Sequence, residues 1–325
     1  MKEALLDANF PRDPKTRATY HVGTAPGQVA NRIITVGDFV RARRIAQYFD
    51  GGKPVFEFLS QRNFLTLTGT YHNVPITVVA IGMGFPLVDF FVRECRAVVL
   101  GDLIVVRLGS CGSLDADISL GSIAVPLRSH GVFRNYDWFH PQTTEKERQS
   151  SKPYHVTKPL DADIELHDLL VSCLEAETPP ASLDLFSGRQ PRTMASITNG
   201  SADSFYSSQG RLSGDAFWDA NDDWIHQMAG SEYGIQTLDM ETYFLHHLAI
   251  AAAGDPANPQ PHGRWQIRTA AVQMIFANRH TSAFITPGEV HQLEMWASKA
   301  VCEALIKTPI PPDSVQMEGV WNRTF

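Results

Sequence analysis

The chain has 325 residues, of which 43% are hydrophobic, and a formal net charge of −7. This length and apolar content are ample for a sizeable buried core, in one large domain or two small ones. The acidic balance argues against a nucleic-acid surface, so a bound anion would have to be held by local arginines.

The composition of individual segments excludes further classes. The N-terminal stretch has no apolar h-region of a secretory signal, and the most apolar stretch, residues 75–92, is broken by glycines, a proline and an aspartate. The cysteines have no paired spacing, so they predict small buried hydrophobes and neither a zinc site nor disulfides. We therefore expect a cytoplasmic protein without metal, membrane or nucleic-acid partner.

The first part of the chain alternates between two patterns. An irregular arm, residues 1–30, is rich in proline and polar groups and precedes RIITV at 32–36, an apolar run of strand length. Residues 39–50 then have helical spacing. Further strands are predicted at 76–86, 103–114 and 121–127, and a second helix at 87–99. Strand, tight turn and helix in this order indicate an α/β fold.

The second part continues the alternation. Residues 143–152, TTEKERQSSK, predict a solvated loop. Beyond it we predict a helix at 161–176, a strand at 191–200, a strand feeding a helix at 234–253, and a strand at 265–279. A last helix at 286–307 opens with a capping box of Thr286 and Glu289, and its apolar face predicts a structural role. The domain would span 31–310 and be followed by a tail, 311–325.

Candidates for anion binding follow two of the predicted strands. Ligands of open α/β sheets bind beyond the carboxyl ends of strands. Gly37 allows close backbone approach at a helix N-terminus, which suits an anion, although Arg41 in the first turn opposes the helix dipole. Arg107 lies inside an apolar run, so it either pairs with a carboxylate or waits for an anionic ligand. The adjacent Ser110 adds a hydroxyl and favours a phosphate site.

Two further stretches carry paired polar groups. In extended chain, the side chains of Asp239 and Glu241 share one side, where carboxylates suit the vicinal hydroxyls of a sugar. An acidic helix N-terminus is the simpler alternative. Gln209 and Arg211 also point the same way in extended chain, and their donors and acceptor match the O2, N3–H and O4 edge of uracil. Phe205 would then cover a flat ring face.

Taken together, five motifs resemble a known family. They are TVGDFVRARRIA, GMGFPLVDFFVREC, VVRLGSCGSL, SADSFYSSQGR and LDMET. Their order and spacing are similar to those of nucleoside phosphorylase-I proteins, and most of all to uridine phosphorylases, from about His21 to the last helix. The resemblance implies a three-layer α/β/α fold around a distorted mixed β-barrel. It also implies reversible conversion of uridine and phosphate, a co-substrate, to uracil and ribose 1-phosphate, without a cofactor.

The resemblance also assigns roles to single residues. The phosphate site would contain Gly37, Arg41, Arg107 and Ser110, with Arg62 reaching the site of a neighbouring subunit. The ribose site would contain Met240, Glu241 and, across a dimer, His21. The uracil site would contain Phe205, Gln209, Arg211 and, near O4, Arg279. These roles imply a homo-oligomer, at least a dimer, with a shared active site to which the N-terminal arm contributes.

The implied mechanism is electrostatic. Uracil would leave with negative charge, to which Gln209 and Arg211 donate, and one well-placed donor lowers such a barrier by about 3 kcal/mol. Arg107 would position phosphate, and Glu241 the sugar, so that these four residues are the predicted catalytic groups.

Several positions depart from the bacterial uridine phosphorylase pattern. Ser110 replaces a threonine and keeps its hydroxyl. Asp239 replaces a glutamate, a shorter arm that would loosen a sugar contact. Phe39 replaces the proline of a GDPDR loop, so the backbone conformation of this turn is less restricted. Asn63 stands in place of an acidic residue that helps to hold an interfacial monovalent cation, so we expect no such cation.

The motifs leave alternatives. Purine phosphorylases and nucleosidases use an aspartate near the end of the last strand, where this chain has Ala277-Asn278-Arg279. That difference favours uracil over purines, while deoxyuridine and thymidine stay open as substrates. A non-catalytic nucleoside binder of the same family is a second alternative, against which the presence of Arg41, Arg62 and Arg107 argues.

Overall fold

The computed structural model describes residues 7–179, 186, 188–254 and 265–322. One part of its mixed sheet is built around β1 (Arg32–Val36), which lies between β4 (Val74–Ala80) and β5 (Leu103–Ser113) and is parallel to both. Two antiparallel strands, β3 (Leu65–Tyr71) and β2 (Phe56–Leu59), extend the sheet beyond β4. The motif after β1 is thereby placed at the carboxyl ends of parallel strands.

The other part of the sheet closes into a ring. β5 pairs with β11 (Ile267–Asn278), β11 with β6 (Ile123–Arg134), β6 with β9 (Thr193–Ala202), β9 with β10 (Thr237–Asp239), and β10 again with β5. The β11–β6 and β10–β5 pairs are antiparallel and the others parallel. This ring confirms the predicted mixed barrel. The short strands β7 (Tyr154–Val156) and β8 (Leu160–Asp161) pair with β6, and β12 (Ala283–Phe284) with β11.

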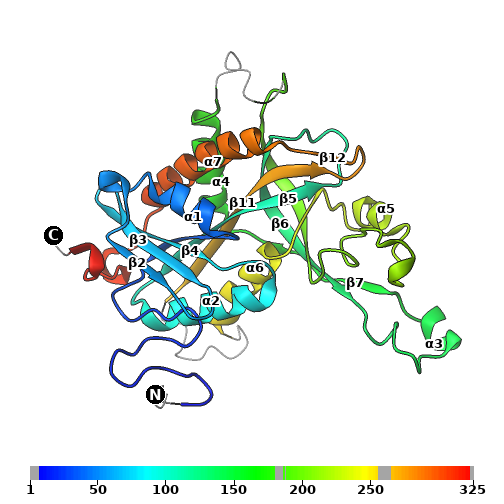
Figure 1. Cartoon of the computed structure of the whole chain (residues 1–325), viewed down its shortest axis with the longest axis horizontal. Coiled ribbons are helices and arrows are strands. Elements are labelled where there is room, and N and C mark those ends of the chain that lie inside the picture. The colour runs from blue at the N-terminus through cyan, green and yellow to red at the C-terminus, as the bar shows by residue number, and fades with distance from the viewer. Residues whose placement is uncertain (1–6, 180–185, 187, 255–264, 323–325) are drawn as a thin grey trace.

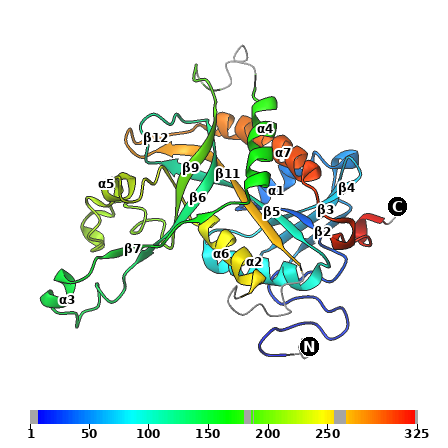
Figure 2. The ribbon, with the colours of Figure 1, turned by 180° about the vertical axis from the view of Figure 1, so that it is seen from behind.

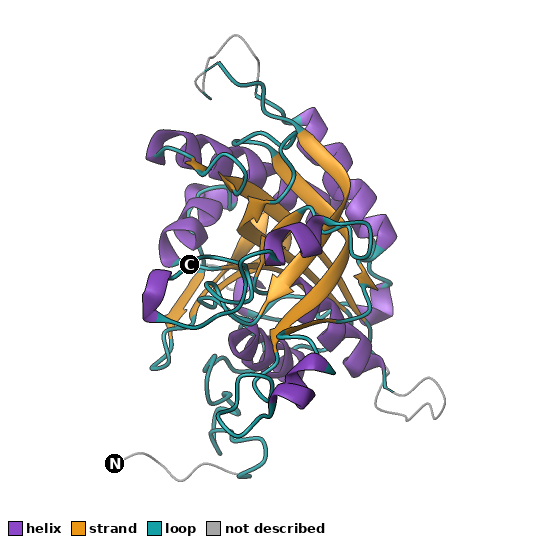
Figure 3. Cartoon of the chain, turned by 90° about the vertical axis from the view of Figure 1, so that its right-hand side faces the viewer, coloured by secondary structure: helices purple, strands orange, loops and turns teal. Residues whose placement is uncertain are grey.

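Helices cover both faces of the sheet (Figures 1, 2 and 3). One face carries α1 (Phe39–Ala46), α4 (Ile164–Ala176) and α7 (Pro287–Lys307), and the opposite face carries α2 (Phe85–Val98) and α6 (Thr242–Ala253). Successive side chains of β5 point to opposite faces of the sheet. Ile104 and Val106 join the core beneath α1, α4 and α7, and Leu103 and Val105 join the core beneath α2 and α6. The three-layer α/β/α prediction is confirmed.

Some elements differ from those predicted. The β2–β3 hairpin was not expected, because its second strand, LTLTGTY, alternates threonine with leucine and lacks the continuous apolar run that marks the other strands. The first helix ends at Ala46 and not near residue 50. Residues 143–152 are solvated, but they include the short helix α3 (Glu145–Gln149), and α5 (Trp224–Ala229) is a further helix that was not predicted.

Two compositional expectations can be compared with the structure. All four cysteines are buried and free, as their spacing predicted. Within the described ranges, no helix combines the length and apolar character needed to cross a membrane.

Two capping boxes in the described part of the chain allow a matched test. Thr286 at α7 and Thr144 at α3 accept the same hydrogen bond from the backbone of a glutamate three residues later. We expect Thr286→Ala to lower the free energy of unfolding by about 1 kcal/mol, because α7 packs on the sheet and its first turn unfolds with the core. Thr144→Ala should have little effect, since α3 is exposed and opens locally.

Urea unfolding followed by circular dichroism measures both changes. An equal loss of unfolding free energy in the two variants would contradict the conclusion that α7, but not α3, unfolds together with the core.

Candidate active site

A cavity of about 320 Å³ lies where β1, β5 and β10 end and α1, α2 and α6 begin. Of the residues that the sequence assigns to the site, most line this cavity, although they come from distant parts of the chain. They are Gly37, Arg41, Arg107, Ser110, Phe205, Gln209, Arg211, Met240 and Glu241. His21, Arg62 and Arg279 are not among its lining residues.

Arg107 is a buried cation that lines the cavity, with 3% of its surface exposed. Its Nη2 forms an ion pair with Glu241 Oε2 at 3.0 Å. Its Nε and Nη1 are buried and have no hydrogen-bond partner among the described residues. An unmet buried donor costs about 1–3 kcal/mol, and more when it is charged. Arg107 therefore pairs with a carboxylate, the first of the two expectations, and has two donor atoms without a partner in the described part of the chain, while anion binding stays a prediction.

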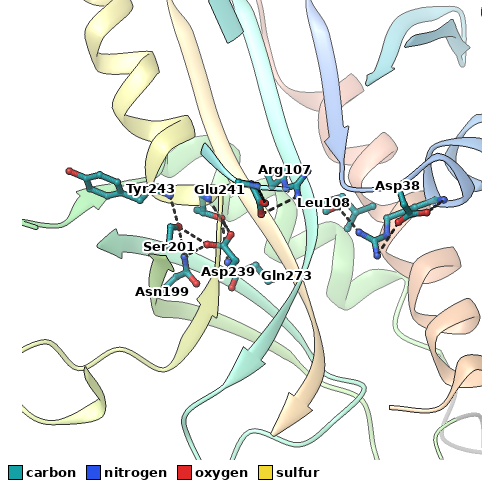
Figure 4. Close-up of polar contacts among 12 residues, drawn as sticks. Asp38, Arg107, Leu108, Asn199, Ser201, Asp239, Glu241, Tyr243 and Gln273 are labelled. Atoms are coloured by element: carbon teal, nitrogen blue, oxygen red, sulfur yellow. Dashed lines mark hydrogen bonds and ion pairs between the residues drawn. The ribbon is translucent and has the colours of Figure 1, made fainter. Parts of the chain in front are cut away.

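Glu241 connects three elements around Arg107 (Figure 4). It precedes α6 as the N-cap, and its Oε1 accepts a hydrogen bond of 2.7 Å from the backbone N–H of Gly84, the N-cap of α2. Burial raises the pKa of Glu241, and the positive charge of Arg107 limits the rise. A carboxylate has about four acceptor sites, so Glu241 keeps about two for hydroxyl groups of a ligand.

Arg41 is buried in the first turn of α1. Its Nε donates to Glu294 Oε1 at 2.9 Å, and its Nη1 lies 3.4 Å from the carbonyl oxygen of Leu108. Glu294 also pairs with Arg44 and comes from α7, the helix to which the sequence assigned only a structural role. The one available signal was an acidic residue within the apolar face of that helix. The carboxylate holds Arg41 against the middle of β5.

The segment that holds Gln209 and Arg211 is a turn and not an extended strand. Gly210 has a φ of +64°, a conformation that glycine adopts without strain. The turn nevertheless brings the pair together, because Arg211 Nη1 donates to Gln209 Oε1. Arg211 Nη1 also donates to the carbonyl oxygen of Phe205 at 2.8 Å, and the guanidinium carbon of Arg211 lies 3.6 Å from the centre of the Phe205 ring.

Arg211 keeps further capacity to bind. Burial, together with the neighbouring charge of Arg279, lowers the pKa of Arg211 to about 10, so the side chain stays a cation at neutral pH. Its Nε and Nη2 have no hydrogen-bond partner among the described residues. These groups can donate to an acceptor in the cavity.

Arg279 supports the turn that carries Gln209 and Arg211, and its place near O4 of a base stays a prediction. Its Nη1 and Nη2 donate to the backbone carbonyl oxygens of Gln209 and Gly210 at 3.0 and 3.1 Å. Its side chain also packs beside Gly112, near the end of β5. Arg279 thus fixes the turn against the barrel from outside the cavity.

The predicted pairing of Asp239 with Glu241 on one side of the chain is wrong. Asp239 directs its carboxylate into the barrel, toward Asn199 and Ser201, while Glu241 faces Arg107 (Figure 4). The extended geometry ends at Asp239, the last residue of β10, and the backbone then turns into α6. The two carboxylates consequently have separate surroundings.

His21 and Arg62 lie close to each other on another part of the molecule. Glu94 accepts hydrogen bonds from the backbone N–H of His21 at 3.0 Å and faces its Nδ1 at 2.7 Å. Arg62 Nη2 donates to the hydroxyl of Tyr20 at 2.8 Å, and the rings of Tyr20 and His21 are 4.9 Å apart. Glu94, which the sequence did not single out, therefore orders the end of the arm. The contribution of His21 and Arg62 to another subunit's site stays a prediction.

The unmatched donors of Arg107 predict anion binding that stabilises the fold. Inorganic phosphate at 100 times its Kd should stabilise the native state by about 2.7 kcal/mol, which raises the unfolding temperature. Arg107→Gln should remove most of this increase. The control is Arg268→Gln, because Arg268 is held by Asp163 and Glu165 and does not line the cavity.

Differential scanning fluorimetry over a phosphate series measures the three proteins. Equal phosphate-induced shifts in the wild type and Arg107→Gln would contradict the role of Arg107.

This chain is similar to known proteins over most of its length. The family model described as Phosphorylase superfamily matches residues 31–254. The uridine phosphorylase of Thermococcus kodakarensis is 26% identical over 306 residues, which are 93% of this chain and 91% of that protein. A DeoD-type purine nucleoside phosphorylase of Myxococcus xanthus is 35% identical over 108 residues, but these span only 33% of this chain and 44% of that protein.

Solved structures extend the comparison to the fold. A structure from a study of two diverse uridine phosphorylases of the oomycete Phytophthora capsici has a TM-score of 0.84 and 32% identity, covering 94% of this chain and 100% of its own. A Trypanosoma brucei nucleoside phosphorylase, reported to show uridine phosphorylase activity, has a TM-score of 0.70 and 17% identity over 92% of this chain and 100% of its own, which shows the fold alone. The resemblance predicted from the motifs is confirmed. With more than half of its length matched by the family model, the chain belongs to the phosphorylase superfamily.

Proposed function

We propose that this protein catalyses the reversible phosphorolysis of uridine to uracil and ribose 1-phosphate. The observation that carries the proposal is the set of groups in one cavity. The cavity combines the unmatched donors of buried Arg107, the open acceptor sites of Glu241 and the guanidinium of Arg211 beside Gln209. These groups suit a phosphate, the hydroxyls of a sugar and the carbonyl edge of a pyrimidine.

At the phosphate end, the protein supplies position and charge. Arg107 and Arg41 line the cavity with Ser110 and the backbone of Gly37. Each arginine is already held by a carboxylate, which fixes its direction before the anion arrives. Phosphate bound to the free donors would be oriented for attack on C1′ of the nucleoside, which removes much of the entropy cost of bringing two reactants together.

At the base end, the protein supplies donors for developing charge. As the glycosidic bond breaks, uracil gains negative charge on O2 and the ring, while the ribosyl group becomes an oxocarbenium-like cation. Arg211 would donate to that charge from a fixed position, held by Gln209 and Phe205. The Phe205 ring would cover one face of the base.

A purine substrate would require an acidic side chain near N7. Among the described residues near the end of β11, the neutral Asn278 stands in its place. Asn278 donates to the carbonyl oxygens of Asp115 and Ile118 and accepts from the backbone N–H groups of His280 and Thr281. Its amide is therefore committed to structure. This arrangement supports a pyrimidine over a purine, and the same cavity would admit deoxyuridine or thymidine.

The proposal includes a homo-oligomer, at least a dimer, in which His21 and Arg62 complete the site of a neighbouring subunit. Both residues lie outside the cavity of their own chain, and they share the contact with Tyr20. One surface would thus deliver a ribose contact and a phosphate contact together. The reaction itself needs no cofactor, because phosphate is a co-substrate, and a cytoplasmic location stays a prediction from sequence.

The substrate assignment is tested by phosphate-dependent turnover. We expect loss of uridine absorbance that requires inorganic phosphate, with kcat/KM for uridine well above that for inosine. Release of ribose 1-phosphate should match the uracil formed. Faster turnover of inosine would move the substrate to purine nucleosides, and absence of turnover with either would favour a non-catalytic binder.

The shared site predicts complementation between two inactive variants. Arg211→Ala should lower kcat by about 10²–10³-fold, the usual loss for one charge-stabilising donor, and Arg62→Ala should weaken phosphate-dependent turnover. A heterodimer of one Arg211→Ala chain and one Arg62→Ala chain would have one intact site, so its activity should recover to about half that of the wild type.

Differently tagged chains allow the heterodimer to be purified and assayed. Arg128→Ala is the control, because Arg128 is exposed and paired with Asp161. If the heterodimer is no more active than the single variants, Arg62 acts within its own chain or not at all.

A further inference from the structure

The carboxylate of Asp239 is fully occupied by hydrogen-bond donors. Its Oδ1 accepts from Asn199 Nδ2 at 3.0 Å and from the hydroxyl of Ser201. Its Oδ2 accepts from the backbone N–H of Thr242 at 3.2 Å and from the hydroxyl of the same residue. Since a carboxylate has about four acceptor sites, none is left for a hydroxyl of a ligand.

These donors belong to a larger buried network (Figure 4). Ser201 Oγ accepts from the backbone N–H of Tyr243 at 2.9 Å, and Gln273 Nε2 donates to Thr242 Oγ1 at 3.3 Å. The network joins β9, β10 and β11 of the barrel to the first turn of α6. Because these residues are buried, such bonds are strong when all are made, and loss of one leaves a costly unmet group.

The same carboxylate closes the short loop that carries the predicted sugar contacts. Met240 and Glu241 lie between Asp239 and Thr242, the two ends that the carboxylate ties together. The backbone carbonyl oxygen of Asp239 accepts from Gln209 Nε2 at 3.2 Å. One residue therefore touches the loop that lines the sugar side of the cavity and the turn that carries Arg211.

We propose that Asp239 is a positioning residue that fixes Met240, Glu241 and Gln209, and that it makes no contact with the sugar. The inference rests on the proposed function and deepens it. The shorter arm of aspartate was predicted to loosen a sugar contact; here it directs the carboxylate into the barrel, and recognition of the sugar hydroxyls is left to Glu241. Asp239 should then affect ribosides and 2′-deoxyribosides alike.

The test compares kcat/KM for uridine and for 2′-deoxyuridine. Asp239→Asn presents an amide to donors that require acceptors, so we expect both values to fall by about 10–100-fold, as for a small misplacement of catalytic groups. The ratio of the two values should stay at that of the wild type. Asp239→Glu should not rescue either substrate, because the longer arm cannot fit the network. A direct sugar ligand would instead be restored or strengthened by glutamate.

Two further variants keep the result interpretable. Glu241→Gln is the contact control, and it should change the uridine to 2′-deoxyuridine ratio. Ser201→Ala removes one donor to Asp239 without touching the carboxylate, and it should cause a smaller loss that is again equal for both substrates, even if Asp239→Asn fails to fold.

Distinct results overturn the two proposals. A loss confined to uridine in Asp239→Asn, or a gain on uridine in Asp239→Glu, would show a direct sugar contact and reject the positioning role. A wild type that does not cleave uridine would reject the proposed function. In that case the same ratio is measured with inosine and 2′-deoxyinosine, and the same two outcomes decide the role of Asp239.

Discussion

The buried ion pair between Arg107 and Glu241 is the interaction on which the arrangement of the site depends. It joins the middle of β5 to the N-cap of α6, and Glu241 adds the N-cap of α2 through Gly84. Burying two charges costs several kcal/mol per ion, and removing one partner is destabilising by about 3–5 kcal/mol. The pair is thus a poor source of stability, but it fixes three elements around the place where the anion is proposed to bind.

A similar arrangement recurs at Arg41, whose guanidinium is held by Glu294. Arg41 and Arg107 are therefore both paired with carboxylates before any ligand is present, whereas Arg211, the third arginine that lines the cavity, has no such partner among the described residues. In a chain with a net charge of −7, attraction of an anion to this end of the cavity then depends on the individual N–H groups of the arginines and not on an overall positive charge. Direction, more than total charge, decides which anion fits, and oriented donors are also what transition-state stabilisation requires.

The sequence was informative where short-range patterns decide the structure. Apolar runs that end in glycine located β1 and β5, and the rule that ligands bind beyond strand ends brought Gly37, Arg107 and Glu241 to one site. It was uninformative where distant segments meet. Glu294 reaches Arg41 across 253 positions, and the carboxylate of Asp239 binds Asn199 and Ser201 of β9 inside the barrel. The segment around Gln209 is also a turn and not the extended chain that we assumed, although the side chains of Gln209 and Arg211 are still in contact.

The contact between Arg279 and the turn that is proposed to recognise the base has a consequence for how this protein can change. Its guanidinium holds the carbonyl oxygens of Gln209 and Gly210, which every amino acid possesses, and no side chain of the turn is part of that contact. Exchanges at Phe205 or Gln209 would leave these two bonds in place. The contacts that hold the backbone of the turn are therefore independent of the side chains that are proposed to recognise the base. New base preferences could evolve by exchange of these side chains while the backbone contacts stay the same.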